Sequence, residues 1–205
     1  MQWAQQQRHG GFTIVELLIV VVVIAILAAI VIVSYNGISL NARNTARIST
    51  AFQAMKVINM YTSQNGSEPL RSAVASVSGC YGKGLPDVNN DGVGDCRYNG
   101  TSASTSNVAA LDTLLETTGA YGRINYPPVI DTYAGPQLVS FSGSVNGGPN
   151  TNNLQLRYYL EGTDQSCGVS GILTLVSTGV WTTSGAKNTG GAGGTTACLV
   201  YIPAS

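Results

Sequence analysis

The 205-residue sequence contains few charged side chains, which make up 10% of the chain. An average soluble protein is about 25% charged. Lys and Arg balance Asp and Glu, so the formal net charge is zero, and no basic run interrupts this balance. The composition therefore gives no sign of strong electrostatic binding to nucleic acid. It suits an exported protein that packs among copies of itself without mutual repulsion, and it also suits a flexible stalk.

Histidine is nearly absent, since the one histidine is His9, close to the N-terminus. A Ser-His-Asp or Cys-His catalytic arrangement is therefore excluded in the rest of the chain. The sequence also lacks a phosphate-binding loop and a dinucleotide-binding glycine motif. These absences predict a protein that is not an enzyme and that needs no cofactor, apart from the calcium considered below.

A long apolar segment is present near the N-terminus. Leu17–Val33 contains no polar residue, and Phe12, Ile14 and Val15 extend the apolar character toward the N-terminus. About 22 residues of α-helix are roughly 33 Å long, close to the hydrocarbon thickness of a bilayer. Because a helix satisfies its own backbone groups in lipid, the sequence predicts a transmembrane helix over residues 12–34.

Glu16 is the one ionisable residue in this segment. An ionisable group inside a membrane is costly and marks a functional site by default. A polar leader, residues 1–11, precedes the segment and ends in Gly10 and Gly11. A secretory signal peptide instead has its small residues after the apolar core. Cleavage after Gly11 would remove the leader alone and keep the membrane helix.

The order Gly11, Phe12, Thr13 and Glu16, followed by a long apolar helix, resembles the processing and assembly motif of type IV prepilins and pseudopilins. The resemblance is at motif level over residues 8–35 and only architectural beyond them. It implies that prepilin peptidase cleaves between Gly11 and Phe12, and that Phe12 is then N-methylated. It also implies that Glu16 neutralises the positive N-terminus of a neighbouring subunit during filament assembly.

The resemblance supplies the partner that Glu16 lacks within its own segment. Two groups that are each costly to bury alone would become a pair between subunits. The implied protein is a structural subunit of a type IV pilus-like surface filament. Its precursor would be a single-pass membrane protein. Its partners would be other copies of itself, related pilins, prepilin peptidase and an inner-membrane assembly platform.

Other functions remain open at this point. A pseudopilin of a type II secretion or DNA-uptake machine would share the same N-terminal features. A plain single-pass anchor, carrying a monomeric binding protein or adhesin, would need Glu16 to reach the membrane surface with its side chain. An anchored enzyme is a further alternative, against which the missing catalytic residues count.

Apolar and polar residues alternate with helical spacing after the membrane segment, as is typical of an amphipathic helix. The apolar positions are Ile48, Ala51, Phe52, Met55 and Ile58, and the polar ones are Arg43, Arg47, Gln53 and Lys56. Gly66 suits a left-handed cap and Pro69 blocks continuation of the helix. We therefore predict an amphipathic helix over residues 35–64 that packs under a globular head, residues 65–205.

The last third of the chain is predicted to form antiparallel strands separated by glycine-rich turns. Strand patterns cover Asn153–Leu160, Gly171–Ser177, Gly179–Thr183 and Ala197–Ile202. Earlier in the head, Val108–Thr117 has helical spacing, Thr101–Ser106 is expected to be a linker, and 125–145 contains strand-like pieces. The fold class is thus α+β: a long N-terminal helix packed on a C-terminal antiparallel β-sheet, which is also the pilin shape.

Four cysteines lie outside the membrane segment, and an even number suggests disulfides in an oxidising compartment. Four cysteines allow three pairings. We favour Cys80 with Cys96 and Cys167 with Cys198, because each pair closes a local loop worth about 3 kcal/mol in the chain-entropy model. Reduced thiols or a metal site are the alternatives, and the absence of a CxxC motif argues against zinc.

The segment 87–95 has oxygen-bearing side chains at alternating positions, as in the D-x-[DN]-x-[DN]-G calcium loop. Gly92 permits the tight backbone curl, whereas Tyr98 stands where an EF-hand has its bidentate glutamate. We expect a helix-free calcium loop, and the alternative is an Asn/Asp/Gly-rich surface turn. The candidate ligands are Asp87, Asn89, Asp91 and Asp95 through their side chains and Val93 through its carbonyl.

Overall fold

The computed structural model describes residues 11–69, 78–80, 82, 84–87, 94–99, 102–106, 115–120, 122, 135–169, 171–183 and 194–203. The chain divides into two compact units, Met1–Asn41 and Ala42–Ser205. The first unit contains the apolar part of a helix and the second contains the head. Each unit is described by itself.

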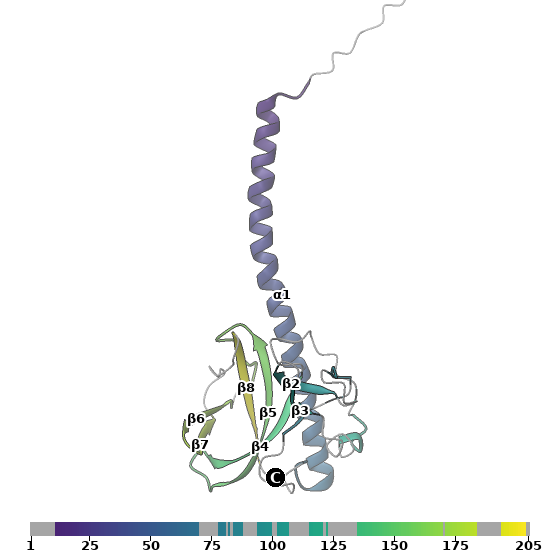
Figure 1. Cartoon of the computed structure of the whole chain (residues 1–205), viewed down its shortest axis with the longest axis vertical. Coiled ribbons are helices and arrows are strands. Elements are labelled where there is room, and N and C mark those ends of the chain that lie inside the picture. The colour runs from purple at the N-terminus through teal and green to yellow at the C-terminus, as the bar shows by residue number, and fades with distance from the viewer. Residues whose placement is uncertain are drawn as a thin grey trace, which may run out of the picture. The chain divides into compact units, whose positions relative to one another are not determined.

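One helix, α1, runs from Ile14 to Asn65 (Figure 1). In the first unit its large apolar side chains are exposed along the whole length from Ile14 to Tyr35. The helix is long and apolar enough to cross a membrane, and none of its most apolar stretch is buried within the protein. The first unit therefore has the form of a membrane anchor, as expected for a membrane-anchored precursor.

The second unit contains a six-stranded sheet in the order β6-β7-β4-β5-β8, with β1 paired to the start of β4 (Figure 1). A separate two-stranded hairpin pairs β2 with β3. The strands are β1 (Ser78–Cys80), β2 (Asp95–Asn99), β3 (Ser102–Ser106), β4 (Gln137–Val145), β5 (Thr151–Glu161), β6 (Leu173–Ser177), β7 (Val180–Thr183) and β8 (Thr195–Ile202). The α+β fold class is confirmed.

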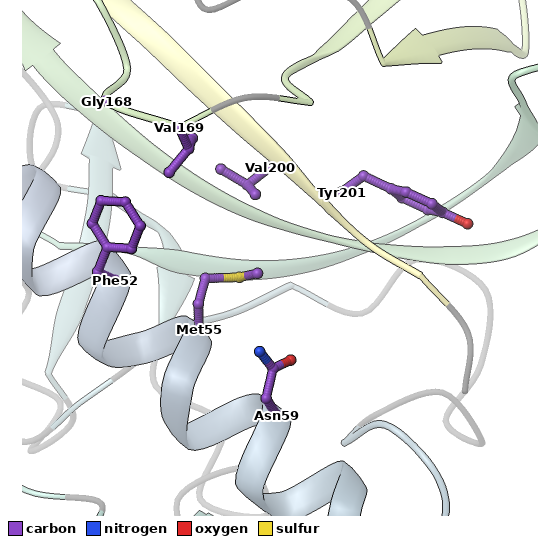
Figure 2. Close-up of a pocket in the computed structure, with 7 residues that line it drawn as sticks. All are labelled: Phe52, Met55, Asn59, Gly168, Val169, Val200 and Tyr201. Carbon is purple, nitrogen blue, oxygen red and sulfur yellow. The ribbon is translucent and has the colours of Figure 1, made fainter.

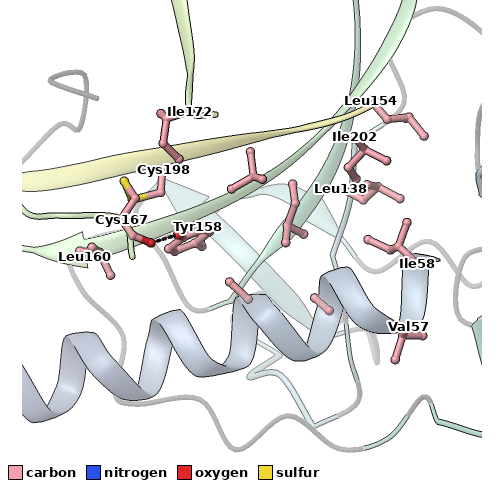
Figure 3. Close-up of a cluster of buried hydrophobic side chains, with 14 of the residues drawn as sticks. Val57, Ile58, Leu138, Leu154, Tyr158, Leu160, Cys167, Ile172, Cys198 and Ile202 are labelled. Carbon is pink, nitrogen blue, oxygen red and sulfur yellow. Dashed lines mark hydrogen bonds between the residues drawn. A yellow bond between two sulfur atoms is a disulfide. The ribbon is translucent and has the colours of Figure 1, made fainter. Parts of the chain in front are cut away.

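Side chains along a strand alternate between the two faces of the sheet, and both faces of strands β5 and β8 are covered. One face packs against the part of α1 in the second unit and forms the main core (Figure 3). The opposite face forms a smaller cluster under the β6–β7 hairpin. From β5, Leu156 and Tyr158 lie in the main core, whereas Tyr159 lies in the smaller cluster.

Two disulfides join Cys80 to Cys96 and Cys167 to Cys198, the same pairing that local loop closure favoured. The second disulfide lies in the main core, where the Tyr158 hydroxyl donates a hydrogen bond to the Cys167 carbonyl (Figure 3). It ties the loop after β5 to the middle of β8. The first disulfide ties β1 to β2 and so connects the main sheet to the small hairpin.

The expectation of a purely antiparallel sheet was wrong at one pair of strands. β4 and β7 are parallel, with Ser144 opposite Val180 and Val145 opposite Trp181. The chain reverses from β4 to β5 and again from β6 to β7, whereas β5 and β6 run in the same direction. Two reversals restore the direction of β4, and the sheet is mixed.

The face of the amphipathic helix also differs from the prediction at two positions. Ala51 and Ile58 of the predicted apolar face are buried, but Phe52 is 49% exposed. Arg47, expected on the polar face, is completely buried. Helical spacing predicts which residues share a face of the helix. It cannot predict that a buried arginine on that helix lies beside an acidic residue far away in the sequence.

Two expectations for the middle of the chain have different outcomes. Thr101–Ser106 was expected to be a linker, but Ser102–Ser106 is strand β3, whose residues pair with β2. Pairing across the hairpin thus overrides the weak local preference of serine and alanine for strands. Most of the predicted helix Val108–Thr117 lies outside the described residues, and Leu115 and Glu116 at its end are helical.

Candidate functional site

The helix α1 begins with a capping box formed by Thr13 and Glu16. The backbone N–H of Thr13 and its hydroxyl each donate a hydrogen bond of 2.8 Å to Glu16 Oε2. In return, the Glu16 N–H donates to the Thr13 hydroxyl at 3.2 Å. This reciprocal arrangement satisfies donors that a helix start otherwise leaves open. The negative charge also lies at the positive end of the helix dipole.

Both hydrogen bonds from Thr13 end on the same carboxylate oxygen, Oε2. A carboxylate has about four lone-pair sites on its two oxygens, so one oxygen remains geometrically able to accept from another group. Glu16 itself is fully exposed at the helix start. The site can therefore receive a cation from outside this chain while the capping box stays closed.

The peptide bond between Gly11 and Phe12 lies directly before this capping box, and both residues are exposed. Among the described atoms, none lies within 4 Å of the position that a Cβ at Gly11 would take. The fold of the chain thus places no visible demand for glycine at this position.

Thr13 is the residue whose structural role sequence reasoning missed. The family resemblance includes Thr13 in its motif but implies no function for it. The spacing Thr-x-x-Glu is the capping-box signature, and it stands directly before the apolar run. That pattern alone could have predicted both the start of α1 and the hydrogen bonds of Glu16.

A second polar constellation fixes the first turns of α1 in the second unit to the end of β5. Arg43 donates two hydrogen bonds from Nε to Glu161, at 2.8 and 3.0 Å, and a third from a terminal nitrogen to Oε2 at 2.7 Å. A terminal nitrogen of buried Arg47 lies 3.7 Å from Glu161 Oε1. Asn44 exchanges two hydrogen bonds with the backbone of Glu161.

The pKa of Glu161 is lowered below its ordinary value. The hydrogen bonds from Arg43 are the largest cause, and the charges of Arg43 and Arg47 act in the same direction, while partial burial opposes them. Sequence reasoning missed this ion pair. Two arginines four positions apart repel each other on an isolated helix, and this spacing could have suggested an acidic partner without showing which residue it is.

The candidate calcium segment is only partly described. Asp87 is exposed, Asp95 is completely buried, and the Asp95 N–H donates to the Pro86 carbonyl at 2.7 Å. The other three predicted ligands, Asn89, Asp91 and Val93, lie outside the described residues. The described part of the chain holds no group of three His, Cys, Asp or Glu side chains that could bind a metal. Calcium therefore stays a prediction.

Comparison with known proteins identifies the N-terminal segment. The family model described as the prokaryotic N-terminal methylation motif matches residues 6–32. No curated protein matches the chain, and no solved structure matches it. The matched range contains Gly11, Phe12, Thr13 and Glu16 and ends before the second unit begins.

The motif belongs to a structural rather than an enzymatic family, and it implies processing by prepilin peptidase and assembly into filaments. The resemblance noted from residues 8–35 is thereby confirmed. Over residues 6–32 the chain carries a type IV prepilin-like leader motif.

Proposed function

We propose that this protein is a structural subunit of a type IV pilus-like surface filament. In this proposal it is made as a membrane precursor, cleaved between Gly11 and Phe12, N-methylated at Phe12 and polymerised through α1. The observation that carries the proposal is the position of Glu16. It stands in the first turn of α1, directly before an apolar stretch whose large side chains are exposed.

Cleavage would create the cation that Glu16 lacks. The nitrogen of Phe12 is part of a peptide bond in the precursor, and it becomes a positively charged amine when the leader is removed. The capping box occupies Oε2 of Glu16, so the amine of a neighbouring copy could approach Oε1 without breaking the helix start. An ion pair between subunits would then offset the cost of holding either charge in an apolar filament core.

This ion pair matters because burial of the apolar surface contributes little to the free-energy difference between α1 in the membrane and α1 in a filament. Lipid tails are as apolar as Ile or Val side chains, so moving α1 from lipid into a bundle of helices gains packing but little hydrophobic free energy. The Glu16 carboxylate, in contrast, is unfavourable in lipid. Its pairing with the new amine therefore favours assembly after cleavage over residence in the membrane.

The experiment that tests this function compares three forms of the full chain in cells with a working assembly machine. Glu16→Gln keeps a capping side chain but removes the charge, whereas Glu16→Ala removes both. We expect both variants to be cleaved and to stay in the membrane, and we expect neither to form filaments. Filaments in normal number from Glu16→Gln would contradict the ion pair.

Mass spectrometry of the mature N-terminus tests processing directly. The proposal requires a chain that begins at Phe12 and carries a methyl group on its nitrogen. A mature protein that retains residues 1–11 would refute it.

A pseudopilin of a type II secretion or DNA-uptake machine is the second candidate, since the matched motif is common to both groups. Negative-stain microscopy of the cell surface distinguishes them, because a pilin forms long surface filaments under ordinary expression.

A further inference from the structure

We draw no further inference here: the strongest candidate, the uncharged groove between α1 and β8 that is lined by Phe52, Met55 and Val200 among others (Figure 2), carries nothing because nothing in the structure shows what covers it.

Discussion

The two units differ in whether the chain can cover its own apolar surface. In Met1–Asn41, the large apolar side chains of α1 are exposed from Ile14 to Ile38. In Ala42–Ser205, the same helix buries Ala54 and Ile58 against β-strands of its own chain, and two disulfides reinforce the fold. The head is thus stabilised from within, whereas the first unit needs lipid or other copies. We infer that assembly is encoded mainly in the first unit.

The largest effect is expected when the first unit is prevented from moving from the membrane into a filament. Gly11→Leu should prevent cleavage, because a bulky residue would occupy the position before the cut bond. We expect a precursor about 1.2 kDa heavier than the mature chain, counting eleven residues at about 110 Da each, and a complete loss of filaments. Denaturation of the head should be unchanged. Filaments built from uncleaved protein would contradict the inference that assembly depends on a processed first unit.

Within the second unit, the largest effect is expected at the ion pair between α1 and β5. Glu161→Ala would remove the carboxylate that lies 3.7 Å from a terminal nitrogen of buried Arg47 and that accepts the hydrogen bonds of Arg43. We expect a loss of about 3 kcal/mol in the free energy of unfolding, at the low end for a broken buried pair because Glu161 is partly exposed. Chemical denaturation in detergent measures this loss. Lys56→Ala, an exposed position on the same helix, should change stability by less than about 0.5 kcal/mol.

The same ion pair predicts a pH dependence. Because the pKa of Glu161 is lowered in the folded protein, its stabilising contribution is fully present above the unfolded value, about 4.3. The contribution is lost as the pH falls through the folded pKa. The stability difference between the unaltered protein and Glu161→Gln should therefore be constant near neutral pH and shrink below about pH 4. A difference that stays the same in acid would exclude the carboxylate as its cause.

Bound calcium would further stabilise the head from within. We propose that the segment 87–95 binds one Ca²⁺ with oxygen ligands from Asp87, Asn89, Asp91, Asp95 and the Val93 carbonyl. Calcium at about 100 times its dissociation constant should stabilise the head by about 2.7 kcal/mol. Thermal unfolding with calcium, magnesium or a chelator checks this, and Asp87→Asn with Asp91→Asn serves as the variant. No calcium-dependent shift in the unaltered protein would leave the surface turn as the explanation.

The smallest effect is expected at the start of α1. Thr13→Ala removes the hydroxyl that caps the helix and binds Glu16. Loss of an N-cap typically costs about 1 kcal/mol of helix stability, so the first turn should fray and filament number should fall only in part. Amide exchange in detergent micelles reports the fraying. Thr13→Ser keeps the hydroxyl and should behave as the unaltered protein does, and an equal defect in both variants would exclude capping as the cause.

Much of the fold could be predicted from local patterns. The helix predicted over 12–64 is found as Ile14–Asn65, ending at Gly66 with a positive φ of 69°, as a left-handed cap requires. Strands β5 and β8 lie within a few residues of their predicted bounds. Such features depend on neighbours in sequence. The leader motif could likewise be recognised from the sequence, because it is defined by the spacing of Gly11, Phe12 and Glu16 and not by the fold.

The sequence by itself determined where α1 begins and ends, that its first part is strongly apolar, and that the N-terminal residues carry a prepilin-like leader motif. The tertiary structure decided that Arg47 is buried beside Glu161, that β7 runs parallel to β4, and that Phe52 stands open beside a groove. The physical reason is distance along the chain. Arg43 and Glu161 are 118 positions apart, and no local propensity carries information over that separation.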